Sequence, residues 1–237
     1  MKILAFDTST AQGSVAVIEG EASAGTYKLL AERVWRREKS HSEFLTAEIE
    51  LALIDACLKI SDISQIAVGH GPGSFTGIRV AINAARTLSY ALSIPVSEFE
   101  TSQSLIEPVA RIDLPALTII NAQKNSYFVA KFRQDSGRWL QEAPTALLSL
   151  QELEAQLMTP HLCLGDGCSE VEKCLSEKAK ASFVRDNQIN DFPLASSLGR
   201  LLLSSGSQAR SLVWNAVRPL YLRASGAEEK LREDSKS

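Results

Sequence analysis

A glycine-rich stretch is the feature that most limits what this chain can form. Residues 66–79 read Ile-Ala-Val-Gly-His-Gly-Pro-Gly-Ser-Phe-Thr-Gly-Ile-Arg: an apolar run, a glycine-rich turn, and a helix that begins at Ser74 or Thr76. Glycine permits positive φ and close approach of the backbone to another group. A helix N-terminus offers unpaired N–H groups and a partial positive charge. The stretch therefore predicts a strand–loop–helix unit whose loop contacts an anion or another segment of backbone.

The glycine spacing separates this loop from the common nucleotide-binding motifs. No Gly-Lys-Ser/Thr is present, so the loop is not a Walker A phosphate loop. The spacing Gly71-x-Gly73-x-x-x-Gly77 is one residue longer than the dinucleotide fingerprint, although Glu98 lies where a ribose-binding acid is expected. From chemistry alone, a turn whose glycines serve packing is an equal alternative to an anion site.

Composition indicates an ordinary globular protein. The chain has 237 residues, of which 45% are hydrophobic and 22% charged, enough for one large or two small domains. A net charge of −3 argues against strong autonomous binding to a nucleic-acid backbone. No apolar run approaches the roughly 18 residues of a membrane span, and the N-terminus has no signal layout, so we expect a cytoplasmic protein. The four cysteines fit no zinc spacing, and we expect reduced thiols and no metal site.

The order of predicted elements repeats along the chain. Strands 3–9 and 14–18, joined at Gln12-Gly13, are followed by a strand near 28–36, a helix over 42–60, a strand at 65–69, a helix over 76–93 and a strand at 94–99. The order begins again with strands 114–120, 126–132 and 137–140, a helix at 149–158, a strand at 161–164, and helices at 168–178 and 193–204. This pattern predicts an α/β protein with mixed sheets flanked by helices, and a boundary within 100–113.

Two helices carry more apolar surface than one core requires. In the helix over 42–60, one apolar stripe runs from Leu45 to Ile60, and a second lies on the opposite side. The second stripe contains Phe44, Ala47, Leu51, Ile54 and Leu58. In the helix over 76–93, Val80, Ala84 and Leu88 extend the apolar arc. A surface helix of a monomer carries one apolar stripe, so the surplus predicts a helix-on-helix protein interface. The alternative is that the two helices cover each other within one domain.

Four segments carry a resemblance to a known family. The loop Gly69–Arg79 closely resembles the signature of the TsaB family, also called YeaZ. The opening Asp7-Thr8-Ser9-Thr10, the pair His41-Ser42 before a helix, and the C-terminal Pro219-Leu-Tyr-Leu-Arg223 resemble further family segments. The resemblance covers most of residues 1–100 and the end near Arg223, and is thin between them.

The resemblance implies a fold and a division into domains. The TsaB family has the duplicated actin/Hsp70-like ATPase fold, a ribonuclease H-like arrangement of two mixed-sheet domains flanked by helices. We therefore expect an N-terminal domain over 1–103 that carries the partner-binding helices. We expect a C-terminal domain over 104–223, whose last segment returns to the first domain, and a disordered tail over 224–237.

The resemblance also implies a role without catalysis. TsaB proteins are accessory subunits in the synthesis of threonylcarbamoyladenosine on tRNA, at the adenosine beside the anticodon. The implied partners are the transferase TsaD, which docks on the two helices, and the ATPase TsaE. A homodimer through the same surface is also implied, and tRNA would be met only through the complex. The residues implied at this interface are Phe44, Ala47, Leu51, Ile54, Leu58, Val80, Ala84 and Leu88.

One position departs from the family pattern. After the strand that ends at Ile120 the family usually shows Asp-Ala-Arg, whereas this chain has Asn121-Ala122-Gln123. Two charges are absent, which puts any role of those charges in question here.

The residues offer no catalytic set. There is no histidine pair at metal spacing and no Gly-x-Ser-x-Gly elbow. Asp7 either binds phosphate and metal, as in active members of the fold, or holds the hairpin turn through its own backbone, which we favour. The main rival is an ATP-using enzyme with Asp7, Thr8, Gly71, Gly73 and Thr76 around the phosphates. A peptidase and a dinucleotide-binding domain are further rivals. We expect no cofactor, except ATP at a surface shared with partners.

Overall fold

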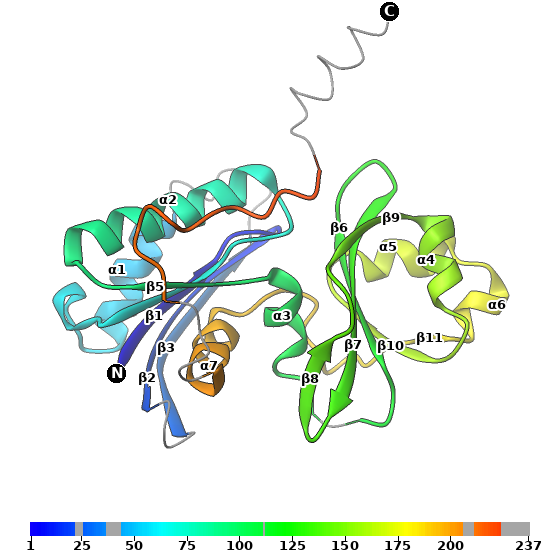
Figure 1. The fold of residues 1–237 in the computed structure, drawn as a ribbon, viewed down its shortest axis with the longest axis horizontal. Helices are drawn as coiled ribbons and strands as arrows, with labels where there is room; N and C mark the ends of the chain where they lie inside the picture. The colour runs from blue at the N-terminus through cyan, green and yellow to red at the C-terminus, as the bar shows by residue number, and fades with distance from the viewer. Residues whose placement is uncertain (22–25, 37–43, 111, 206–210, 224–237) are drawn as a thin grey trace, which may run out of the picture.

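The computed structural model describes residues 1–21, 26–36, 44–110, 112–205 and 211–223. They form two mixed sheets with helices on their faces (Figure 1). The first sheet has the order β3-β2-β1-β4-β5, in which β1, β2 and β3 are antiparallel and β4 and β5 run parallel to β1. Its strands are β1 (Lys2–Asp7), β2 (Gln12–Glu21), β3 (Thr26–Arg36), β4 (Gln65–Gly69) and β5 (Val96–Phe99).

The second sheet repeats this topology. Its order is β8-β7-β6-β10-β11, again three antiparallel strands followed by two parallel ones, and β9 pairs with β7 off this path. The strands are β6 (Ala116–Asn121), β7 (Ser126–Asp135), β8 (Arg138–Gln141), β9 (Ala146–Ser149), β10 (His161–Leu164) and β11 (Phe183–Val184). The predicted duplication of one α/β unit is therefore confirmed.

Helices cover both faces of each sheet because the buried strands are apolar on both sides. In β1, Leu4 and Phe6 point to the side of α1 (Leu45–Asp55) and α2 (Phe75–Leu92), whereas Ile3 and Ala5 point to α7 (Ala195–Ser205). The second sheet has α4 (Leu150–Gln156), α5 (Cys168–Cys174) and α6 (Glu177–Lys180) on one face and α3 (Thr101–Ile106) on the other. No helix of the described residues is long and apolar enough to cross a membrane.

The two halves exchange a helix. α3 follows β5 of the first sheet but packs on β6 of the second, and α7 follows the second sheet but packs on β1 and β2 of the first. The two exchanged helices also contact each other, between the sheets (Figure 1). The predicted boundary after residue 103 falls inside α3, and the predicted domain limits stay predictions.

The predicted hairpin turn at Gln12-Gly13 is wrong. The turn lies at residues 8–11, and Gln12 already begins β2. Gly13 lies within β2, opposite Trp35 of β3, and the position requires glycine because a Cβ there would lie 2.3 Å from Cζ2 of Trp35. A glycine that admits an indole ring has the same sequence signal as a glycine in a turn.

The predicted helix over 42–60 is too long. α1 ends at Asp55, because Cys57 takes a left-handed conformation (φ 55°) and the Leu58 N–H donates to the Leu53 carbonyl at 2.9 Å, which closes the helix end. A 3₁₀ turn, η2 (Ile60–Asp62), follows. The predicted helix over 168–178 is likewise two short helices, α5 and α6, and α3, β9 and β11 were not predicted. His41-Ser42 and the tail 224–237 lie outside the described residues.

Candidate functional site

The turn after β1 is buried and held by its own side chains. Asp7, Thr8 and Ser9 have no more than 1% of their surface exposed. The Ser9 N–H and hydroxyl both donate to Asp7 Oδ1, at 2.7 and 2.5 Å, and the Thr8 hydroxyl donates to the Gly77 carbonyl at 2.7 Å. Asp7 therefore closes the turn with its own backbone, the arrangement favoured from the sequence.

The glycine-rich loop lies directly on this turn. The Ser74 N–H donates to the Ser9 carbonyl at 2.6 Å. A Cβ at Gly73 would lie 2.2 Å from the Ser9 carbonyl oxygen, and one at Gly77 would lie 1.8 Å from that of Thr8. The space that the glycines open is thus occupied by backbone of the same chain. Its carbonyl oxygens carry the same sign of charge as a phosphate.

The five residues predicted around a phosphate are only partly brought together. Asp7, Thr8 and Gly73 lie at the contact between turn and loop, whereas Gly71 faces Ile78 and the Leu220 carbonyl, and Thr76 is exposed in the first turn of α2. Sequence reasoning missed Thr101, whose hydroxyl donates to Ser9 Oγ at 2.8 Å and whose N–H donates to the Gly71 carbonyl at 2.8 Å. Thr101 begins α3, an element that the sequence did not predict, so no signal pointed to it.

The segment 212–223, here called the C-terminal strap, contacts the glycine-rich loop. The Leu220 N–H donates to the His70 carbonyl at 2.8 Å. The Tyr221 ring stacks on Phe75 with centroids 4.7 Å apart, and Arg79 Nε donates to the Tyr221 hydroxyl at 2.9 Å. The two most family-like motifs of the sequence therefore form one cluster.

The strap runs antiparallel to α2 and ends at the second domain. Near its start, the Trp214 ring meets that of Tyr90 on α2 edge-on, with centroids 5.4 Å apart. Further along, the Val217 carbonyl accepts from Nε of Arg86 on α2 at 3.2 Å. At its other end, an Arg223 guanidinium N–H donates to the Ala122 carbonyl at 2.6 Å, in the turn between β6 and β7. The strap therefore joins α2 to the second sheet.

The residues predicted at a partner interface differ in exposure. On α1, Ala47, Leu51 and Ile54 are exposed, Leu51 by 40% and Ile54 by 61% of its surface, and Phe44 is half-buried at the helix N-cap. The opposite stripe of α1 is buried in the first core: Leu45, Ile49, Ala52 and Leu53. The remaining predicted residues, Leu58, Val80, Ala84 and Leu88, are half-buried and pack against the same core.

The departure from the family pattern at residue 121 has a local partner. The Asn121 side-chain amide donates to Glu170 Oε2 at 2.8 Å, and its backbone N–H donates to Asp166 Oδ1 at 2.9 Å. An aspartate at position 121 would place its carboxylate against that of Glu170, so the neutral amide matches this environment. Burial, followed by the charge of Glu170, raises the pKa of the neighbouring Tyr127 to about 12. Gln123 is exposed in the turn.

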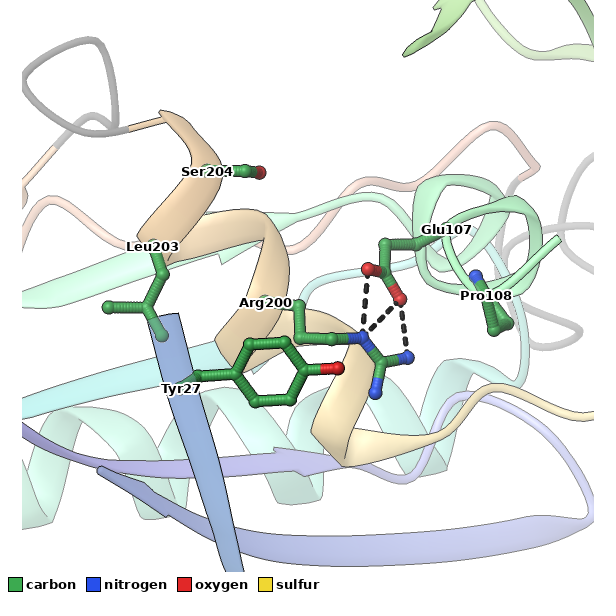
Figure 2. A pocket seen from close by; sticks show the side chains of 6 residues that line it. All are labelled: Tyr27, Glu107, Pro108, Arg200, Leu203 and Ser204. Carbon is green, nitrogen blue, oxygen red and sulfur yellow. Dashed lines mark hydrogen bonds and ion pairs between the residues drawn. The ribbon is translucent and has the colours of Figure 1, made fainter. Parts of the chain in front are cut away.

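An ion pair joins the two exchanged helices. Arg200 of α7 donates from Nε to both carboxylate oxygens of Glu107, which follows α3, each at 2.8 Å (Figure 2).

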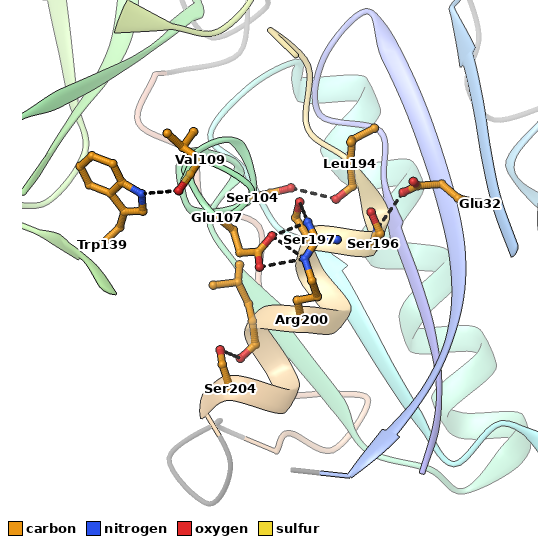
Figure 3. A network of polar contacts seen from close by, with 11 residues as sticks. Glu32, Ser104, Glu107, Val109, Trp139, Leu194, Ser196, Ser197, Arg200 and Ser204 are labelled. Atoms are coloured by element: carbon orange, nitrogen blue, oxygen red, sulfur yellow. Dashed lines mark hydrogen bonds and ion pairs between the residues drawn. The ribbon is translucent and has the colours of Figure 1, made fainter. Parts of the chain in front are cut away.

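Beside the pair lies an open cavity of about 490 Å³, lined by Tyr27, Glu107, Pro108, Arg200, Leu203 and Ser204. Figure 3 shows the surrounding contacts, in which Ser104 donates to the Leu194 carbonyl at 3.1 Å. Because its polar groups bond to one another, we assign this junction a structural role.

The described residues contain no cluster of three or more His, Cys, Asp or Glu side chains that suits a metal. Of the histidines, His70 contacts the Arg218 carbonyl through Nδ1 at 3.1 Å, and burial lowers the pKa of His161. The four cysteines are free thiols, and burial raises the pKa of Cys163 to about 12, which makes it a poor nucleophile.

Comparisons with known proteins give a consistent result. The family model described as "TsaD: tRNA N6-adenosine threonylcarbamoyltransferase" matches residues 28–199. The chain is 26% identical to the tRNA threonylcarbamoyladenosine biosynthesis protein TsaB of Bacillus subtilis over 100% of both chains. It is 24% identical to the protein of the same name from Escherichia coli over 98% of both. An uncharacterized protein of Mycobacterium tuberculosis is 39% identical over 40% of this chain and 43% of its own length.

The structural comparisons agree on the fold. The structure of YeaZ from Pseudomonas aeruginosa has a TM-score of 0.76 at 23% identity and covers 93% of this chain and 99% of its own. A second Pseudomonas aeruginosa structure, described as similar to peptidase YEAZ, has a TM-score of 0.77 at 23% identity, covering 94% and 99%. Together with the repeated sheet order, these likenesses show the duplicated actin/Hsp70-like fold.

Proposed function

The chain belongs to the TsaB (YeaZ) family, and on this premise we propose that it is a non-catalytic subunit that binds and activates the transferase TsaD. Its pathway is the synthesis of threonylcarbamoyladenosine on tRNA, the process for which the Bacillus subtilis and Escherichia coli relatives are named. In this assembly it holds TsaD in an active state and contributes to the surface on which TsaE docks.

The observation that carries the proposal is the second apolar face of α1. Leu51 and Ile54 are 40% and 61% exposed, although the helix already buries a full stripe that includes Leu53 in its own core. α1 also contacts α2, whose half-buried row contains Val80 and Ala84. An apolar helix face that is exposed in the isolated chain marks a site where another protein binds and covers it. A pair of helices on the partner fits such a face. The same surface would serve a homodimer in the absence of TsaD.

The state of the glycine-rich loop supports a role without catalysis. The carbonyl oxygens of Thr8 and Ser9 fill the space that Gly73 and Gly77 leave open. Asp7, whose carboxylate lies against Gly69 at the start of the loop, accepts hydrogen bonds from Ser9. A phosphate could enter only if the turn after β1 moved away from the loop. The loop therefore serves to join two segments of the first domain.

Light scattering after size exclusion tests the proposal, with this chain and TsaD from the same organism. We expect a heterodimer peak for the wild type and its loss for Leu51→Glu, because the interface would bury an unpaired charge. Thr46→Glu is the matched control, since Thr46 is exposed on the same helix outside the apolar stripe, and it should keep the peak. A heterodimer that survives Leu51→Glu, or no heterodimer with the wild type, contradicts the proposal.

One observation favours the rival, an ATP-binding enzyme. Asp7, Thr8 and Gly73 do lie at one place, where the turn after β1 meets the glycine-rich loop, as a phosphate site requires. Calorimetry of the isolated chain with ATP and magnesium separates the two. Our proposal expects no saturable heat at millimolar nucleotide, and saturable binding would favour the enzyme.

A further inference from the structure

The charges of this chain are distributed unevenly along the sequence. Residues 63–97 and 192–227 contain six arginines and no Asp, Glu or Lys. Because the whole chain has a net charge of −3, the remaining residues together carry −9. A charge asymmetry of this kind indicates a surface that meets a polyanion. The small net charge of the whole chain conceals this asymmetry.

The structure places residues 212–223 of the second acid-free segment beside the first, whereas α7, in the second segment, packs on the other face of the first sheet. The first contains the glycine-rich loop and α2, and the second contains the C-terminal strap, which lies along α2 in Figure 1. Contacts at both ends and in the middle hold them together: Arg79 with Tyr221, Arg86 with Val217, and Tyr90 with Trp214. Arg79, Arg86 and Tyr90 fall on one stripe of α2, at spacings of seven and four residues.

The arginines of this surface keep their positive charge unneutralised. Arg86 donates to the Val217 carbonyl, Arg218 donates to the same carbonyl at 3.0 Å, and Arg79 donates to the Tyr221 hydroxyl. Within the described part of the chain, none of these three forms a salt bridge, in contrast to Arg33, Arg185 and Arg200. Glu98 accepts the backbone N–H of Arg218 at 3.1 Å and leaves the Arg218 guanidinium to its carbonyl partners. Neutral partners orient the guanidinium groups and leave their charge to an outside anion.

Aromatic rings alternate with these arginines along the strap. Trp214 and Tyr221 are 43% and 39% exposed, and Tyr90 beside Trp214 is 69% exposed. The Arg79 guanidinium carbon lies 4.0 Å from the centre of the Phe75 ring, which fixes its position. Surfaces that combine backbone-neutralising arginines with exposed rings are typical of single-stranded nucleic-acid binding, since every base has a face that stacks.

We propose that the surface formed by α2 and the C-terminal strap binds single-stranded RNA, with Arg79 and Arg218 contacting phosphates and Tyr221 stacking on a base. The proposal rests on the proposed function, in which the modified adenosine lies in the anticodon loop of tRNA. It departs from the expectation that tRNA is met only through the complex, because it adds a direct contact by this subunit. Few charges take part, so the contact is weak alone and strengthens when the docked transferase holds the same RNA.

Fluorescence anisotropy with a labelled anticodon stem-loop RNA, measured over a series of salt concentrations, tests the proposal on the full-length chain. The variant is Arg79→Gln with Arg218→Gln. We expect about a tenfold loss of affinity at low salt and a slope of log K against log salt that is shallower by about 1.4, the value for two lost single-strand phosphate contacts. Arg138→Gln with Lys178→Gln removes two exposed charges elsewhere and should change affinity by less than about twofold.

Three further measurements decide among explanations. Tyr221→Leu should weaken binding to the stem-loop and leave binding to a duplex of equal charge unchanged; equal losses for both overturn the stacking role. Polyglutamate that displaces the RNA at equal charge concentration overturns the proposal in favour of an acidic protein partner. The arginine variant should still form the heterodimer with TsaD. If it does and its RNA affinity is that of the wild type, this inference fails, whereas loss of the wild-type heterodimer is a failure of the proposed function.

Discussion

Gly77 shows how a single residue fixes the first domain. It lies in the first turn of α2, where alanine would ordinarily favour the helix by up to about 1 kcal/mol. Its Cα, however, rests against the Thr8 carbonyl, and the Thr8 hydroxyl donates back to the Gly77 carbonyl at 2.7 Å. Glycine is therefore needed for close packing of two backbones. Anion binding is not required to explain it.

Gly77→Ala should destabilise the protein, although it raises helix propensity. A Cβ there would lie 1.8 Å from the Thr8 oxygen, a backbone atom that cannot turn aside. We expect a loss of about 2 kcal/mol or more in the free energy of unfolding, measured in urea, as for an overpacked core site. Thr76→Ala, one residue away and exposed, should change it by less than about 0.5 kcal/mol. Equal effects of the two substitutions would contradict the packing of loop on turn.

Asp166 makes the stability of the second domain depend on pH. Burial, and then repulsion by Asp191, raises its pKa to about 6 against the opposing effects of the Asn121 N–H and Arg36. Between the ordinary aspartate pKa of about 4 and this value, the folded protein holds a proton that the unfolded chain has lost. The contribution of Asp166 to stability is therefore complete below about pH 4 and is lost as the pH rises through about 6.

Asp166→Asn should stabilise the protein at pH 7.5 and have little effect at pH 4. The amide keeps an oxygen for the Asn121 N–H and removes the cost of a buried charge. Thermal unfolding at the two pH values measures the difference, with Asp135→Asn, an exposed carboxylate, as the control. A stabilisation that is independent of pH would show that desolvation of the carboxylate is not its cause.

At the scale of elements, α1 has one buried and one exposed apolar face. Substitutions at Leu53 and Leu51, two residues apart, should have different effects on the free energy of unfolding. Leu53 is 7% exposed in the core and Leu51 is 40% exposed. Leu53→Ala should cost about 2–4 kcal/mol of unfolding free energy, because it leaves a cavity. Leu51→Glu should change it by less than about 0.5 kcal/mol, as for a surface position. Chemical denaturation of both variants checks this, and a large loss for Leu51→Glu would place Leu51 in the core.

Regular elements were predictable from the sequence, whereas short elements and contacts between distant segments were not. β10 was predicted with its observed bounds, His161–Leu164, because a short apolar run between turn residues is a clear signal. α1 was predicted too long, because the apolar period continues past Cys57 although the backbone there turns left-handed. β11 has two residues, which is too few for any period to be visible.

The candidate site was predicted as separate motifs and not as an assembly. The glycine-rich loop and the C-terminal motif were both singled out, but 142 positions separate Arg79 from Tyr221, and no spacing rule spans that distance. The loop was expected to contact an anion or a backbone. The choice between them depends on where the turn after β1 lies, which only the fold determines.

At the scale of the whole molecule, two exchanged helices hold the domains together. The ion pair between Glu107, which follows α3, and Arg200 of α7 links the two exchanged helices, and both side chains are 18% exposed. Glu107→Gln should cost about 2 kcal/mol and speed hydrogen exchange in both α3 and α7, since Arg200 keeps its charge and loses its partner. Glu177→Gln breaks a pair in which the glutamate is 92% exposed and should have little effect. Faster hydrogen exchange in α7 alone would show that the ion pair does not couple α3 to α7.

The central claim is that this chain activates a transferase and has no transfer activity of its own. The most direct test is the rate of threonylcarbamoyl transfer to the adenosine beside the tRNA anticodon, measured with TsaD and TsaE from the same organism. The account predicts no product from this chain alone, a marked rise in rate when it is added to the other components, and no rise with Leu51→Glu. Product formed by the chain alone, or full activation by Leu51→Glu, would contradict it.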